Sequence, residues 1–201
     1  KGYVIKEYFS NYFLHQSDLT INLEKNSVEI LNSSTEPWKI TLIDTGLNTM
    51  TGGRIKRAEK YIQDETFLLT YGDGLADVNI TDLMSFHQAH GKKITMTAVQ
   101  PEGRYGALSL GDNDIISSFE EKPKGDGLWI NGGFFVLSKK IFKYLKNNKT
   151  IFEKDCLPKL TRIDQLNSFK HDDFWQCMDT LRDKKFLNIE WKKKNCKWRT
   201  W

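Results

Sequence analysis

A short apolar run that ends in a glycine-flanked carboxylate is the feature that most constrains this chain. Residues 67–71 (FLLTY) are almost continuously apolar, which is typical of a strand covered on both faces. Gly72, Asp73 and Gly74 follow at once. Ligands of α/β sheets collect at the carboxyl ends of strands, so Asp73 is a candidate ligand of a metal ion such as Mg²⁺. An Asx-turn in a tight glycine-rich loop explains the same residues equally well.

Strands and helices alternate along the rest of the sequence, which predicts an α/β protein. Period-two alternation with a turn at Lys25-Asn26-Ser27 predicts a hairpin from Leu19 to Ile30. The 201 residues suit one domain with a sizeable core. Within it we expect a hairpin insertion over 17–47 and a basic helix and tail over 180–201. Helical spacing is found at 2–15, 55–62 and 79–90, and strand patterns at 38–44, 67–71, 94–99 and 133–137.

Composition excludes several classes of protein. No apolar run approaches the roughly 20 residues that cross a bilayer, and the start has no signal-peptide pattern, so no membrane partner is expected. The three cysteines, Cys156, Cys177 and Cys196, form no CxxC pair, which predicts a reducing, cytoplasmic location. The sequence contains neither HExxH nor GxSxG, so zinc-peptidase and serine-hydrolase chemistry have no support.

Three segments carry groups that could contact a ligand. Glu121 can accept hydrogen bonds from sugar hydroxyls, and Lys122 can hold a phosphate as a point charge. A solvated charged turn is the simpler explanation of that segment on spacing alone. Asn131 places an amide beside Gly132, and Gly106 follows an Arg-Tyr pair; in both places glycine permits close backbone approach to a ligand, and a simple turn is the alternative.

The C-terminal part has two features with competing explanations. Asp179 precedes a helix predicted from Leu181 onward, where it can cap the helix or serve as a second metal-binding carboxylate. The basic tail interleaves lysines with Trp191 and Trp198, which can bind nucleic acid. A terminal helix whose aromatic residues pack while its lysines stay in water is favoured, because one short tail is a weak electrostatic signal. We therefore expect no nucleic-acid partner.

Nine segments in order resemble the sugar-nucleotide pyrophosphorylases, and within them the cytidylyltransferase branch. Any single segment is a weak match, but their common order along the whole chain is specific. The segments are Gly2–Phe9, Glu36–Gly46, Met50–Arg57, Thr70–Asp77, His90–Lys93, Arg104–Leu108, Phe119–Gly127, Ile130–Leu137 and Met178–Lys184.

The resemblance implies a Rossmann-like mixed sheet flanked by helices, and a reaction in which CTP and glucose 1-phosphate give CDP-glucose and pyrophosphate with Mg²⁺. It places Asp73 and Asp179 on the metal, which makes both of them catalytic residues. It places Gly53 and Arg54, in a glycine-rich loop, near the cytosine. Around the sugar phosphate it places Gly106, Glu121, Lys122, Asn131 and Gly132, with Lys122 also catalytic. The phosphate nucleophile is already ionised, so a site poor in histidine fits this chemistry.

Two further expectations follow. The family's glycine-rich GGxGTR loop is not among the 201 residues, so we expect an N-terminally truncated fold that gives no turnover alone. The alternative is a non-catalytic relative that binds a sugar phosphate or a partner chain. We also expect a homo-oligomer, because a two-stranded ribbon with one apolar face is not stable by itself in water.

Overall fold

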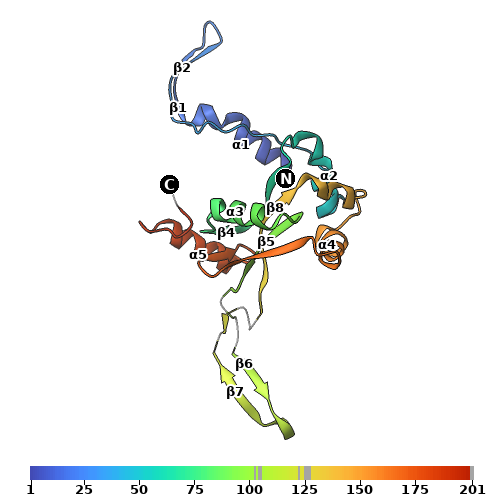
Figure 1. Cartoon of the computed structure of the whole chain (residues 1–201). Coiled ribbons are helices and arrows are strands. Elements are labelled where there is room, and N and C mark those ends of the chain that lie inside the picture. Colours follow the sequence, from blue (N-terminus) through green and yellow to red (C-terminus); the bar gives the residue numbers. More distant parts are fainter. Residues whose placement is uncertain (102, 104–105, 122, 125–127, 200–201) are drawn as a thin grey trace. The chain divides into compact units, whose positions relative to one another are not determined.

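A computed structural model of the chain describes residues 1–101, 103, 106–121, 123–124 and 128–199 (Figure 1). These residues form two compact units, Lys1–Leu47 and Asn48–Trp201. No helix in the described ranges is long and apolar enough to cross a membrane.

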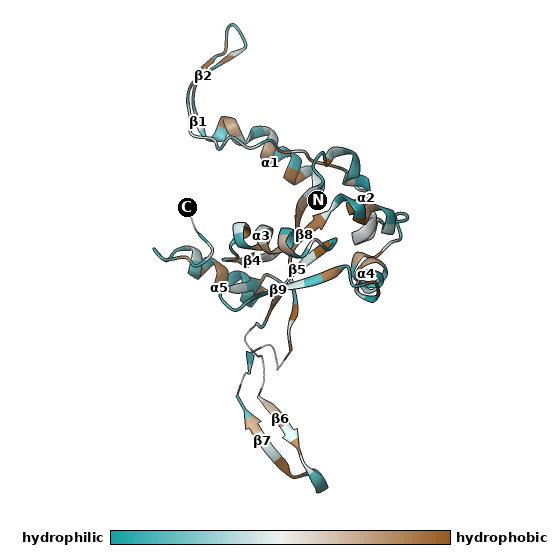
Figure 2. Cartoon of the chain, viewed as in Figure 1, coloured by the Kyte–Doolittle hydropathy of each residue, from teal (hydrophilic) through white to brown (hydrophobic). Residues whose placement is uncertain are grey.

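The first unit contains one helix and one hairpin, both as predicted. Helix α1 (Gly2–His15) is followed by strands β1 (Ser17–Asn22) and β2 (Ser27–Ser33), which pair antiparallel. Asn26 takes the left-handed conformation, with φ of 48°, that closes the turn between them. Hydrophilic and hydrophobic residues are mixed along α1, and none of its residues is buried within the unit (Figure 2).

The strand predicted over residues 38–44 is wrong. None of these residues lies in a strand. Instead, the Trp38 ring stacks on Tyr12 with the ring centroids 6.4 Å apart, and the Tyr12 hydroxyl donates to Glu36 Oε2 at 2.8 Å. A residue pattern can favour extended backbone, but a strand also needs a neighbour that takes its backbone hydrogen bonds.

The second unit is built on a mixed four-stranded sheet in the order β3, β8, β5, β9 (Figure 1). These strands are β3 (Thr66–Thr70), β8 (Ile130–Ser138), β5 (Ile94–Val99) and β9 (Leu166–His171). Strand β8 runs antiparallel to β3 and β5, and β5 runs parallel to β9. The carboxyl ends of β3, β5 and β9 therefore meet the amino end of β8 at one edge, which we call the carboxyl edge.

Side chains of β8 alternate between two hydrophobic clusters. Phe135 and Leu137 pack with residues of η4 (Lys139–Tyr144), η5 (Phe152–Cys156) and α4 (Leu157–Arg162). Val136 points to the other face, where it packs with Val78 and with Leu83 of α3 (Ile80–His90). Helices thus flank both faces of the sheet, and the predicted α/β class is confirmed.

The remaining elements connect or extend this core. Strands β4 and β10 pair with each other, as do β6 and β7. The elements are α2 (Thr51–Ala58), η1 (Glu59–Tyr61), β4 (Gly74–Ala76), α3 (Ile80–His90), β6 (Ala107–Leu110), η2 (Asp112–Asp114), β7 (Ile116–Glu120), η4 (Lys139–Tyr144), η5 (Phe152–Cys156), α4 (Leu157–Arg162), β10 (Trp175–Cys177) and α5 (Leu181–Trp191).

Strand β3 departs from its prediction. It is one of the two edge strands of the sheet, and its Leu68 side chain is 49% exposed, so the strand is not covered on both faces. An apolar run in the sequence indicates that its residues prefer burial. It does not indicate how many neighbouring elements of the described chain are present to cover the strand.

The helix predicted over 79–90 is confirmed, whereas the helix cap suggested at Asp179 is wrong. Asn79 caps α3 by accepting from two backbone N–H groups, and Gly91 ends it with φ of 63°. Helix α5 is capped by Thr180 instead of Asp179. The Thr180 hydroxyl accepts from Asp183 N, and the Asp183 carboxylate accepts from Thr180 N. This reciprocal capping box needs an acidic residue three positions after the cap, which Thr180 has and Asp179 lacks.

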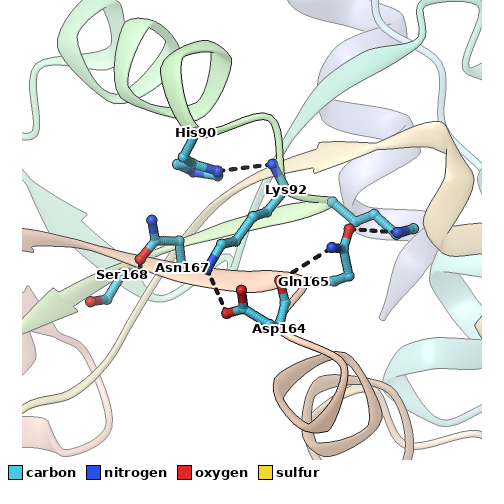
Figure 3. Close-up of polar contacts among 7 residues, drawn as sticks. His90, Lys92, Asp164, Gln165, Asn167 and Ser168 are labelled. Carbon is cyan, nitrogen blue, oxygen red and sulfur yellow. Dashed lines mark hydrogen bonds and ion pairs between the residues drawn. The ribbon is translucent and has the colours of Figure 1, made fainter.

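Polar contacts tie the amino ends of β5 and β9 together, opposite the carboxyl edge (Figure 3). His90 Nδ1 accepts from the backbone N–H of Lys92 at 2.9 Å. The Lys92 ammonium then lies 2.6 Å from Asp164 Oδ1.

In the tail, Trp198 stacks on Phe174, as expected for a terminal segment that packs its aromatic residues.

Candidate functional site

The β4–β10 ladder brings the backbone at Asp73 next to the segment that carries Asp179, the other predicted metal ligand. Asp73 directly precedes β4, and Asp179 follows β10 by two residues. In the antiparallel register Cys177 lies opposite Gly74, and Met178 N donates to the Asp73 carbonyl at 2.9 Å. Residues far apart in sequence are therefore held side by side, with both carboxyl-bearing residues exposed.

The chemistry of this pair suits a hard cation. The carboxylates of Asp73 and Asp179 offer the oxygen ligands that Mg²⁺ prefers, and Mg²⁺ is typically bound by one or two carboxylates plus substrate phosphates. Within the described ranges, no cluster of three or more His, Cys, Asp or Glu residues could hold a metal. A two-carboxylate site that is completed by a phosphate ligand fits this donor set.

A thiol orients one of these carboxylates. Cys177 Sγ donates to Asp179 Oδ2 at 3.1 Å. Burial and this hydrogen bond raise the pKa of the Cys177 thiol to about 11, so it stays protonated at neutral pH. The protonated thiol can then act as a donor to Asp179 without adding a negative charge beside it.

The start of β8 brings Asn131 to the same edge of the sheet. Asn131 Oδ1 accepts from Gly133 N at 2.9 Å, and its amide nitrogen lies 3.4 Å from the Tyr71 hydroxyl. Tyr71 directly follows β3, two residues before Asp73. At Gly132 an added Cβ would lie 2.9 Å from Val99 Cγ1, so close packing on β5 already requires a glycine there.

Gly53 and Arg54 lie in a helix, and the predicted glycine-rich loop over 50–54 is wrong. Helix α2 begins at Thr51, which puts Gly52 and Gly53 in its first turn. A Cβ on Gly53 would lie 2.7 Å from Asn148 Cα. These glycines therefore allow two backbone segments to approach closely. They do not form a tight loop.

Gly106 and Glu121 meet at the foot of the β6–β7 ribbon. A Cβ on Gly106 would lie 2.6 Å from the Phe119 ring and 3.1 Å from Glu121 Oε2. The nearest neighbours of a Cβ at Gly106 all belong to the β6–β7 ribbon and its foot. Lys122, predicted as a phosphate-binding and catalytic residue, lies outside the described residues.

Sequence reasoning missed a carboxylate that contacts two elements of the site. Glu153 in η5 accepts hydrogen bonds from Tyr71 Oη at 2.5 Å and from Thr51 Oγ1 at 2.7 Å. Burial and the bond to Glu153 raise the pKa of Tyr71 far above its ordinary value, which keeps its hydroxyl protonated. No motif marks Glu153, and its two donors are distant in sequence.

With this geometry in view, comparison with known proteins defines the class. Residues 10–189 match the nucleotidyl transferase family, and the chain belongs to that family. Two of the similar curated relatives are named as glucose-1-phosphate cytidylyltransferases. The chain is 52% identical over 202 residues to glucose-1-phosphate cytidylyltransferase of Salmonella typhimurium, covering 100% of this chain and 78% of that one. It is 42% identical, with the same coverage, to a probable glucose-1-phosphate cytidylyltransferase of Bacillus subtilis.

Solved structures support the same fold. The crystal structure of HddC from Yersinia pseudotuberculosis matches with a TM-score of 0.54 and 28% identity, covering 72% of this chain and 63% of that one. A putative glucose-1-phosphate thymidylyltransferase from Bacillus anthracis matches with a TM-score of 0.53 at 15% identity, covering 70% and 61%, and shows likeness of fold alone. The chain thus spans less than two thirds of these solved structures.

Proposed function

We propose that this chain catalyses, or forms part of an enzyme that catalyses, cytidylyl transfer from CTP to glucose 1-phosphate, which yields CDP-glucose and pyrophosphate. The observation that carries the proposal is the hydrogen bond from Met178 N to the Asp73 carbonyl, since it brings Asp73 next to Asp179. The identity of 52% to a glucose-1-phosphate cytidylyltransferase supports the choice of substrates.

The reaction asks for alignment and charge stabilisation. An oxygen of the sugar phosphate bonds to the α-phosphorus of CTP, the bond to the β-phosphate breaks, and pyrophosphate leaves with the electron pair. That oxygen carries no proton at neutral pH, so no general base is needed. Catalysis then depends on holding two anions in line and on offsetting the charge that builds on them.

The residues of the proposed site divide this task. Asp73 and Asp179 would hold Mg²⁺, which offsets phosphate charge when bound. The Asn131 amide donates to the sugar phosphate, and Glu121 accepts from sugar hydroxyls. The backbone comes close to the sugar phosphate at Gly106 and Gly132. Beyond these, Gly53 and Arg54 lie on the cytosine side, and Lys122 supplies a positive charge to the phosphate.

Calorimetric titration with CTP, with and without Mg²⁺, tests the metal site. Mg²⁺ should strengthen CTP binding to the wild-type chain, and D73N or D179N should reduce this gain by at least about tenfold. D173N is the matched control, because Asp173 is an exposed carboxylate in the loop before β10. A gain that survives both variants contradicts the metal site. Binding of glucose 1-phosphate without any binding of CTP would favour the non-catalytic alternative.

We also propose that the chain self-associates. The hairpin of the first unit leaves apolar side chains in solvent, with Ile21 60% and Val28 55% exposed. Covering them with another subunit would remove this apolar surface from water. Light scattering that reports a monomer contradicts this proposal.

A cytoplasmic location is proposed on the cysteines. All three are free thiols in the structure, and two of them, Cys156 and Cys196, are buried. Free thiols persist in reducing compartments.

A further inference from the structure

One carboxylate receives hydroxyl groups from two separate elements. Glu153 lies in η5, a single π-helical turn that precedes α4. Its Oε1 accepts from Tyr71 Oη at 2.5 Å, and its Oε2 accepts from Thr51 Oγ1 at 2.7 Å. Both oxygens of the side chain are therefore engaged. Isolated π-turns are frequent at functional sites, where they displace a side chain from the regular helical path.

The two donors belong to different elements of the candidate site. Thr51 is the first residue of α2, two positions before Gly53. Tyr71 follows β3, two positions before Asp73, and its hydroxyl lies 3.4 Å from the Asn131 amide nitrogen. Glu153 thus connects the helix on the proposed cytosine side with the strand ends on the proposed metal and sugar-phosphate side.

The network has a defined direction. The Thr51 hydroxyl accepts from Phe152 N at 2.9 Å and donates to Glu153. The Tyr71 hydroxyl likewise donates to Glu153, at its other carboxylate oxygen. An ionised carboxylate can accept both hydroxyl protons at once. A glutamine offers only one acceptor oxygen, and its NH₂ group would force one of the hydroxyls to reverse.

We propose that Glu153 is a positioning residue that fixes α2 relative to the β3–β8 end of the carboxyl edge, so that the CTP and glucose 1-phosphate sites keep one geometry. Glu153 acts through Thr51 and Tyr71 and touches neither substrate. This role rests on the proposed function, because that function assigns α2 to CTP and Asn131 to glucose 1-phosphate.

Ligand affinities of conservative variants test the role. E153Q should weaken both Mg²⁺–CTP and glucose 1-phosphate by about tenfold, equivalent to about 1.4 kcal/mol each. T51V should weaken mainly CTP, and Y71F mainly glucose 1-phosphate, because each removes one arm of the network. The matched control is D155N. Asp155 lies in the same turn, but its carboxylate accepts from Ile151 N and so caps only its own turn.

Affinities in E153Q that equal those of the wild type would overturn the proposal. Equal losses in E153Q and D155N would also overturn it, because they would report general loosening of η5. If the wild-type chain binds neither substrate, the proposed function fails, and hydrogen exchange without ligand still decides the role of Glu153. The probes are the amides of Gly53, bonded to Thr150 O, and of Gly133, bonded to Asn131 Oδ1. E153Q should speed exchange at both amides, and unchanged rates at both would refute the coupling.

Discussion

Replacing Gly53 by alanine should destabilise the second unit, although alanine is the better helix former. In an open helix the change would stabilise by up to about 1 kcal/mol. Here the new Cβ would lie 2.7 Å from Asn148 Cα and 2.8 Å from Asn148 O, which are backbone atoms that no rotamer change can move away. Overpacking of this kind costs about 1–3 kcal/mol, so we expect a net loss of about 1–2 kcal/mol.

Urea unfolding followed by circular dichroism measures this loss. Gly72→Ala is the matched control, because a Cβ there meets no atom within 4 Å, and its effect should stay within about 0.5 kcal/mol. Displacing α2 should also weaken CTP binding in G53A. A G53A protein as stable as the wild type would show that the two backbones separate at no cost, and the packing argument would fail.

Three further outcomes are expected. Burial lowers the pKa of His87 and of His90, so as pH falls below about 6.5 the unfolded chain binds protons that the folded chain resists. Stability should fall by up to about 1.4 kcal/mol per pH unit for buried His87 and by less for His90; equal urea midpoints at pH 7 and pH 5.5 would contradict this. Thr180→Ala removes the α5 capping box and should cost about 1 kcal/mol in the same assay, and no loss would mean that the cap is dispensable. Lys92→Ala breaks the ion pair with exposed Asp164 and should cost less than about 1 kcal/mol, so a larger loss would show a buried role for Lys92.

Local signals in the sequence predicted some elements well. Asn79 and Gly91 set the ends of α3 by side-chain capping and by left-handed backbone, both of which act within one turn. The hairpin of β1 and β2 was predicted from alternation and a turn. The prediction of a strand over 38–44 was wrong, because strand pairing requires a partner strand that is distant in the sequence. The prediction of a loop at the start of α2 was wrong, because Gly53 is required by close packing against Asn148, almost a hundred residues away in the sequence.

The candidate site shows the same division. Glycine-rich surroundings and position marked Asp73 and Asn131 as candidates, but only the β4–β10 ladder places Asp179 beside Asp73. Glu153 carries no local signal, since its partners come from two other elements. The expectation that these 201 residues give no turnover alone stays a prediction, and a pyrophosphate-release assay on this chain tests it.

The reversed direction of β8 limits how this protein could be redesigned. Asn131 is the second residue of the strand whose later residues, Phe135 and Val136, pack on opposite faces of the sheet. Sliding the strand by one residue would exchange those two side chains between faces. Repositioning the Asn131 amide would therefore require rebuilding both hydrophobic layers at once. Glu121, the proposed partner of the sugar hydroxyls, lies at the foot of the β6–β7 ribbon, where the flanking strands have no buried residues and substitutions disturb no core.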